Sequence, residues 1–230
     1  MKQIYQCWLL AVFLATIVAG CAPTRFVKPL VTGSTAIGAS VGGPLIKYGK
    51  ATIPVPMSSI VVGHGFRDYL TGFMGVNTTS LAFGVVQTDI GIIRKLYMQD
   101  GWRPAIVLSP VANLMFDKWE NKFSFFPQLD GSFYWHYLHK AHYFYLGISN
   151  WIDFNTKRSQ GDAQKTHWIP IVHVGHRWVT PRWDYVIECK YIAPTHSNRN
   201  IVVEYTGIAN RGAIGLYFGF AWKYAKLRYK

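Results

Sequence analysis

The chain has 230 residues, which is enough for one sizeable domain. Hydrophobic residues make up 50% of it, aromatic residues 16% and charged residues 15%, with 21 glycines; this balance suits short strands and membrane interfaces better than a helical core. A formal net charge of +13 on an aromatic-rich chain would suit nucleic-acid binding. The N-terminal residues instead predict export from the cytoplasm, so we expect no nucleic-acid partner.

The chain opens with the pattern of an export signal. Lys2 precedes an apolar run, beginning at Cys7, that is too short to cross a membrane as an ordinary helix. The run ends at residues 18–21 in the sequence VAGC, and these small residues before a cysteine resemble the lipobox of bacterial lipoproteins. An ordinary secretory signal with a chance cysteine is the alternative.

The lipobox resemblance implies how the N-terminal part of the chain is organised. It implies a cleaved lipoprotein signal peptide over residues 1–20 and lipidation of Cys21, which becomes the mature N-terminus. Ala22 follows the cysteine in place of Asp, and in this family that implies sorting to the outer membrane. We then expect a short basic lipidated tether over residues 21–33 and a β-barrel domain over residues 34–230.

Alternation of apolar and polar residues with period two predicts strands along the rest of the chain, with no convincing helical period. The strands expected in the first half are 34–42, 59–66, 69–76, 81–97 and 103–116. Prolines make residues 44–57 a long connection, and residues 77–79 break the pattern. We expect a bulge or strand end near Pro110, because proline cannot donate to a ladder hydrogen bond.

The clearest alternation lies in the second half. Residues 122–137 and 141–151 form one expected hairpin. Residues 167–179 and 182–193 form the next, with charges of both signs on the face opposite the apolar one. In residues 212–224, aromatic and aliphatic side chains share one face and Gly and Ala the other. This strand resembles the closing strand of outer-membrane barrels, although the chain continues past it.

These features together predict an all-β fold, a single antiparallel up-and-down β-barrel of about ten strands. Short and longer connections alternate along the chain, as a membrane barrel with periplasmic termini requires. Trp168 and Trp178 lie ten residues apart, which on a tilted strand separates them by about 25 Å along the membrane normal. A soluble, lipid-anchored periplasmic barrel with its apolar parity facing a protein core is the alternative. The residues expected in the membrane girdles are Trp135, Trp168, Trp178, Trp183, Tyr191 and Trp222.

Charged residues of both signs share the polar parity and should face a small lumen. Opposite charges pair there, because an unpaired ion away from water is costly. The plain interpretation is a polar filling that stiffens the barrel. A narrow pore or a small-ligand cavity is the alternative, since ten strands lie between filled eight-stranded barrels and open porins. The expected lumen polar network consists of Asp89, Asp130, His173, Arg177, Arg182, Asp184, Glu188 and Lys190.

The last long loop carries the weak catalytic candidates. His196 and Ser197 resemble part of the His-x-Ser-Asn signature of lipid A deacylase barrels, which would make them base and nucleophile, and Glu204 is a candidate to orient the base. The intervening residue of the signature is missing here, and adjacent side chains diverge on an extended strand. Solvated turn chemistry explains these residues more simply.

We expect neither a metal nor a cofactor, because the histidines show no ligand spacing. The expected partners are outer-membrane lipids, with an unspecified envelope protein as a further partner. The sequence therefore predicts an outer-membrane lipoprotein with a structural or interaction role in the cell envelope, and leans against an enzyme. The alternatives are a narrow pore or small-ligand barrel, a lipid-A-type deacylase, and a soluble lipid-anchored barrel.

Overall fold

The computed structural model describes residues 25–49, 51–137, 142–156, 163–164, 166–198 and 204–224. The predicted signal peptide over 1–20 and the predicted lipidation of Cys21 lie outside these residues. Within them, no helix is long and apolar enough to cross a membrane.

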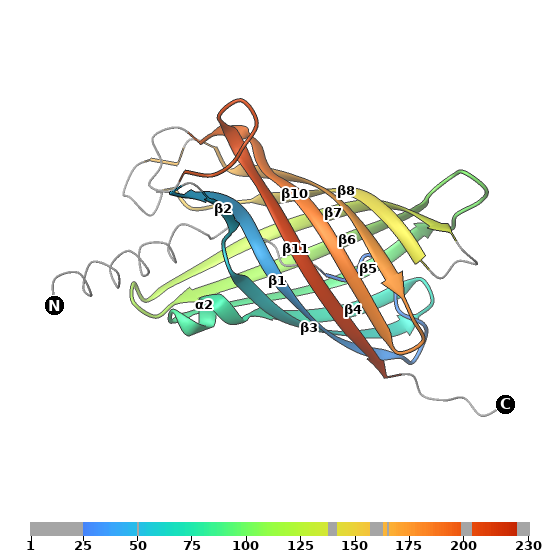
Figure 1. Cartoon of the computed structure of the whole chain (residues 1–230). Coiled ribbons are helices and arrows are strands. Elements are labelled where there is room, and N and C mark those ends of the chain that lie inside the picture. Colours follow the sequence, from blue (N-terminus) through green and yellow to red (C-terminus); the bar gives the residue numbers. More distant parts are fainter. Residues whose placement is uncertain are drawn as a thin grey trace.

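The described chain folds into a closed antiparallel barrel of ten strands with one additional short strand (Figure 1). In the ring, β3 pairs with β1, each strand from β4 to β11 pairs with the strand before it, and β11 pairs with β1 to close the ring. The short strand β2 pairs with β1 at the end of the barrel. This confirms the predicted all-β up-and-down barrel. The strands are β1 (Thr35–Tyr48), β2 (Ala51–Pro54), β3 (Met57–Arg67), β4 (Leu70–Asn77), β5 (Val85–Tyr97), β6 (Ala105–Asp117), β7 (Lys122–Tyr137), β8 (His142–Ile152), β9 (Trp168–Val179), β10 (Trp183–Ser197) and β11 (Arg211–Tyr224).

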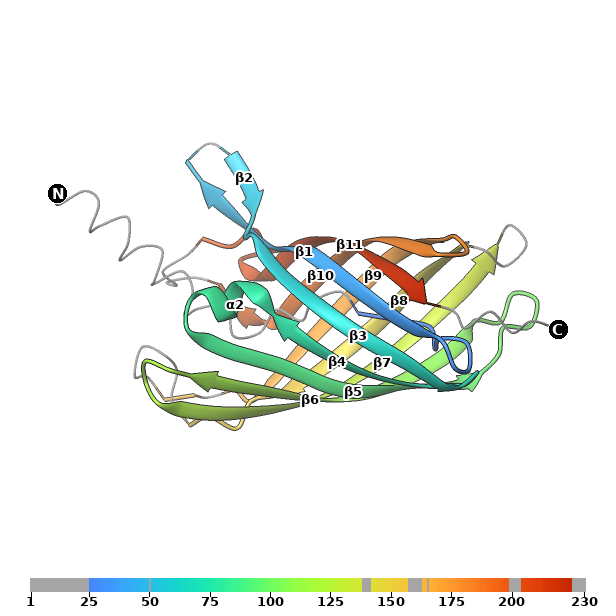
Figure 2. The same ribbon diagram turned by 90° about the horizontal axis from the view of Figure 1, so that it is seen from below.

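The two ends of the barrel differ. At the end that we call the turn end, β1 begins, β11 ends, and a two-residue connection joins β3 to β4. At the opposite end, the loop end, lie the helix α2 (Thr78–Ala82), the β1–β2 hairpin and the segments that follow β8 and β10. Figure 2 shows the β1–β2 hairpin projecting from the barrel at the end that carries α2.

Two loop-end segments differ from the sequence prediction. The expected connection over 44–57 instead continues β1 to Tyr48 and pairs it with β2. Pro54 ends β2 and Pro56 lies beyond it, where no ladder donor is needed, while Pro44 lies within β1 as the last residue paired with β11. The expected break over 77–79 begins a short helix, since the Asn77 side chain accepts a hydrogen bond from the Ser80 amide at 2.9 Å and caps it. The strand expected from residue 81 consequently starts at Val85.

The predicted bulge near Pro110 is wrong. Strand β6 pairs with β7 in unbroken register through Pro110. On the other side, the pairs between β5 and β6 skip Ser109 and Pro110 but keep their register, which shifts only between Lys95 and Tyr97. Proline has no amide hydrogen to donate, but the neighbouring Ser109 hydroxyl donates to the Ile92 carbonyl at 2.7 Å. The side chain thus supplies a hydrogen bond to the adjacent strand.

The alternation sorts the strand residues onto two surfaces. Along β11, Phe218, Phe220 and Trp222 are exposed on the outside, while Ala213, Tyr217 and Ala221 are buried inside. The other barrel strands expose large apolar side chains on the outer face in the same way. This arrangement contradicts the alternative of a soluble barrel with its apolar parity inside, because such a continuous apolar exterior requires a nonaqueous surrounding.

Residues 25–33, which we call the plug segment, enter the barrel: residues 25–30 are buried or partly buried against its inner wall, and residues 31–33 are exposed at the turn end. Phe26, Val27 and Leu30 are buried in a hydrophobic cluster with wall residues of most barrel strands. The Leu30 amide donates to the Thr71 hydroxyl at 2.8 Å, close to the turn end. These residues belong to the segment over 21–33 that the sequence predicts as a lipidated tether. Residues 25–30 lie in the lumen, where their apolar side chains pack against the wall.

Candidate functional site

The centre of the lumen is polar and lies between two apolar clusters. One cluster packs Phe26 and Leu30 of the plug segment against the wall. The other lies toward the loop end and includes Phe126, Trp151 and Ile171. Between them, buried polar and charged side chains from several strands gather around the first residue of the plug segment.

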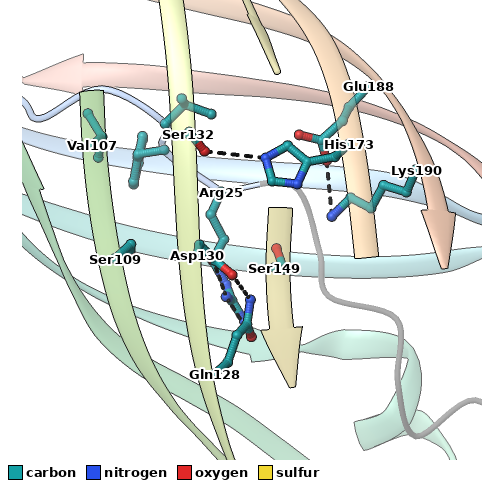
Figure 3. A pocket seen from close by; sticks show the side chains of 12 residues that line it. Arg25, Val107, Ser109, Gln128, Asp130, Ser132, Ser149, His173, Glu188 and Lys190 are labelled. Atoms are coloured by element: carbon teal, nitrogen blue, oxygen red, sulfur yellow. Dashed lines mark hydrogen bonds and ion pairs between the residues drawn. The ribbon is translucent and has the colours of Figure 1, made fainter. Parts of the chain in front are cut away.

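Arg25 is the centre of the first polar group. Its Nε donates to Asp89 Oδ2 at 2.6 Å, and its Nη2 donates to Asn113 Oδ1 at 2.9 Å. Its Nη1 donates to Gln128 Oε1 at 3.2 Å and lies 3.7 Å from Asp130 Oδ2. Each guanidinium nitrogen therefore has its own partner on strands β5, β6 and β7. In Figure 3, Arg25, Gln128 and Asp130 point toward one another.

The wall residues around Arg25 also hold one another. Asn113 Nδ2 donates to the Phe126 carbonyl at 3.1 Å and to Gln128 Oε1 at 2.9 Å. Gln128 Nε2 donates to Asp130 Oδ1 at 2.5 Å. Because the amide nitrogens are engaged in the wall, the amide oxygens face the cation.

A second charged group connects the plug segment to the turn end. Arg177 is buried and its Nη2 donates to the backbone carbonyl of Arg25 at 2.9 Å. Its Nη1 lies 3.8 Å from Asp184 Oδ2, and the other oxygen of Asp184 lies 2.8 Å from Lys223 Nζ. The Arg177 guanidinium also covers the Phe26 ring at 5.9 Å. The wall therefore contacts the plug segment through its backbone as well as its side chains.

A third group joins strands β7 to β10. Glu188 forms an ion pair with Lys190 at 3.0 Å and accepts a hydrogen bond from the Tyr145 hydroxyl at 2.6 Å. His173 Nε2 lies 3.3 Å from the Ser132 hydroxyl. Figure 3 shows Ser132 facing His173, and Glu188 facing Lys190.

These groups border a small cavity next to the plug segment. It measures about 40 Å³ and is lined by Arg25, Gln128, Asp130, His173 and Lys190 among others. Since one water needs roughly 10–15 Å³ of such space, the cavity is large enough for about three waters. It is too small for an organic substrate.

Most of the predicted lumen network lies in these three groups. Asp89, His173, Arg177, Asp184, Glu188 and Lys190 are buried, and Asp130 is partly buried. The prediction is wrong for Arg182, which is exposed in the connection between β9 and β10. It follows the strand parity by residue number, but it lies outside the strand, so parity does not direct its side chain inward.

The residue that sequence reasoning missed is Arg25. Nothing in its local sequence distinguishes it from a basic residue in a tether, since it lies outside the alternating pattern. Asn113 and Gln128 share the polar parity of β6 and β7, so the alternation places them inward, but they carry no charge and were absent from the predicted network. An excess of inward acids on β5 and β7 is the only sequence signal that an extra cation was needed.

The predicted girdle residues lie near the two ends of the barrel. Trp178 and Trp183 flank the β9–β10 connection, and Trp222 pairs with Trp183, so all three lie at the turn end. Trp135 lies at a similar level along the barrel axis, close to the end of β7. At the loop end, Trp168 begins β9; Tyr191 lies toward the same end and donates from its hydroxyl to the Arg211 carbonyl at 3.1 Å.

The weak catalytic candidates lie at the loop end of β10 and in the following loop. His196 Nδ1 lies 3.1 Å from the Thr195 hydroxyl. Glu204 forms an ion pair with Lys47 of β1. Ser197 is exposed at the last position of β10. The carboxylate of Glu204, which lies in the loop between β10 and β11, is thus paired with a lysine of β1.

Comparison with known proteins shows the fold. No protein-family model and no curated relative matches the sequence. An outer membrane channel from Pseudomonas putida F1 is similar in structure, with a TM-score of 0.50, 10% identity, and coverage of 88% of this chain and 100% of that chain. The chain has an outer-membrane β-barrel fold.

Two further solved structures match with lower scores. The NanC porin has a TM-score of 0.45 and 9% identity, with 81% of this chain and 98% of that chain covered. The translocator domain of autotransporter NalP from Neisseria meningitidis has a TM-score of 0.43 and 8% identity, with 97% and 96% covered.

Proposed function

We propose that this protein is an outer-membrane lipoprotein whose barrel is closed by its own plug segment and serves a structural or interaction role in the envelope. The observation that carries the proposal is the set of contacts between Arg25 and the wall. The side chains of Arg25 and Asp89 are only 8% and 4% exposed and form a 2.6 Å ion pair. Removing one partner of such a buried pair leaves the other charge unpaired in the lumen, which lowers the free energy of unfolding by about 3–5 kcal/mol. The closed state is therefore the resting state.

The membrane location is supported by the exterior of the barrel. Apolar side chains occupy the outer face of the strands, and aromatic residues lie near both ends. The pattern is that of strands that contact lipid on one face and a polar lumen on the other. The location is tested by purifying protein that lacks residues 1–21. Aggregation when detergent is removed is expected, and a monodisperse species in plain buffer would contradict it.

The closed lumen is tested by conductance. The full-length mature protein is reconstituted into planar bilayers and into liposomes, with a general porin as the positive control. We expect no channel steps and no swelling above that of empty liposomes. Steady conductance of the wild-type protein would overturn the proposed role in favour of the narrow-pore alternative.

Lipidation is the remaining part of the proposal, and it is supported by the lipobox-like VAGC sequence that ends at Cys21. Mass spectrometry of the N-terminal peptide, together with incorporation of labelled palmitate, tests it. We expect lipid on the wild type and none on Cys21→Ser. An unmodified Cys21 in mature protein would reduce the proposal to a barrel with an ordinary signal peptide.

A further inference from the structure

The wall around Arg25 forms a receptor that belongs to the barrel and not to the plug segment. Its acceptor atoms come from Asp89, Asn113, Gln128 and Asp130 on three adjacent strands. Asp89, Asn113 and Gln128 are 3%, 2% and 4% exposed. The receptor is therefore a set of oxygens on three buried residues and the partly buried Asp130, and the plug segment contributes only the ligand.

Three of the four receptor residues are held by hydrogen bonds that do not involve Arg25. The Asn113 amide nitrogen donates to the Phe126 carbonyl, and the Gln128 amide nitrogen donates to Asp130. On the other side, Gly75 of β4 has no side chain, and a Cβ there would lie 2.9 Å from Asp89 Oδ1. The wall thus fixes the direction of Asn113, Gln128 and Asp130, and preorganised acceptors bind with less loss of side-chain entropy. Asp89 lies in the space that Gly75 leaves and accepts its hydrogen bond from Arg25.

The charge of the receptor requires a cation. Asp89 and Asp130 both form their ion pairs with Arg25, and no other cation of the described residues lies within ion-pair distance of either. Three nitrogens of one planar group each contact a different wall residue. That geometry suits the fixed fork of a guanidinium better than the compact ammonium of a lysine.

We propose that this receptor binds small guanidinium compounds, and that Arg25 is its built-in competitor. The ligand class is an alkylguanidinium cation, the chemistry of an arginine side chain. The inference rests on the proposed function, since the plug segment that closes the lumen is what occupies the receptor. A guanidinium ligand and Arg25 cannot bind together, so the plug segment is an autoinhibitory occupant of this site.

The test removes the Arg25 side chain and adds a small compound that carries the same guanidinium group. Full-length Arg25→Ala protein is heated in detergent micelles while tryptophan fluorescence reports unfolding, with ethylguanidinium, ethylammonium or sodium chloride added at equal ionic strength. We expect ethylguanidinium at about 100 times its Kd to raise the unfolding midpoint of Arg25→Ala by about 5–10 °C. Ethylammonium should raise it less, and sodium should leave it unchanged.

Three matched proteins complete the design. The wild type should not respond, because Arg25 occupies the receptor. Arg67→Ala removes an arginine whose guanidinium contacts Tyr69 at an exposed turn, and it should not respond either. The double variant Arg25→Ala/Asp89→Asn should lose most of the response. Where Arg25→Ala does not fold alone, its refolding yield from urea with ethylguanidinium against ethylammonium gives the same comparison.

Equal shifts in Arg25→Ala and the wild type, or an undiminished response in the double variant, would overturn the receptor. This outcome is separate from the conductance test. If the wild type does not conduct and ethylguanidinium does not raise the unfolding midpoint of Arg25→Ala, the proposed receptor is wrong and the closed barrel still stands. A conducting wild type would remove the closed barrel.

Discussion

Replacing Asp89 with Asn tests whether the Arg25 contact holds the lumen together. Asn keeps the shape of the side chain and removes the charge that lies 2.6 Å from the guanidinium. Breaking a buried ion pair typically costs about 3–5 kcal/mol. We expect the lower end, about 3 kcal/mol, because Asp130 remains 3.7 Å from Arg25 as a second partner.

The interaction itself is isolated by a double-mutant cycle. Arg25→Met leaves both Asp89 and Asp130 without their cation, so it should cost more than Asp89→Asn alone. The double variant should be more stable than the sum of the two losses predicts, by about 0.5–3 kcal/mol, as for residues in contact.

The assay is equilibrium unfolding in urea, in lipid vesicles, followed by tryptophan fluorescence. Urea is needed because guanidinium chloride would supply the cation that the receptor binds. Free energies that add within about 0.5 kcal/mol would refute the reasoning, since residues that are not in contact behave in that way. They would mean that Arg25 lies elsewhere in the membrane-bound protein.

Three other substitutions test the rest of the lumen. Gly65→Ala places a Cβ 2.4 Å from the Val31 carbonyl oxygen, so the plug segment should be displaced and trypsin should cleave within it. Gly131→Ala, whose Cβ would meet nothing within 4 Å, is the matched control. Equal cleavage of both variants would count against the packing described. Tyr145→Phe removes the hydrogen bond to the buried Glu188 carboxylate and should lower the free energy of unfolding in urea by about 1.5–3 kcal/mol. An unchanged unfolding midpoint would show that this hydrogen bond does not form. Arg182→Ala should change the free energy of unfolding by less than about 0.5 kcal/mol, because the Arg182 side chain is exposed. A larger loss would indicate that Arg182 lies in the lumen and takes part in the polar network.

The barrel itself follows from the sequence. Because successive strand residues point to opposite faces, the alternation in residues 122–137 and 212–224 determined which side chains face lipid and which face the lumen. The same rule directed Asp184, Glu188 and Lys190 inward on β10. It failed at Arg182, which lies beyond the strand end. A different rule, that proline interrupts a ladder, failed to predict that β6 continues through Pro110, where the Ser109 hydroxyl donates a hydrogen bond to the adjacent strand.

The tertiary structure alone decided what closes the lumen. Arg25 carries no local pattern, and its position depends on acceptors that lie 64, 88 and 103 residues away in sequence. The sequence determined that Asp89 and Asp130 face inward, and so that the lumen contains buried negative charge. Which cation neutralises that charge depends on long-range geometry, because any basic residue could pair with a carboxylate but only a segment that enters the barrel can reach these two.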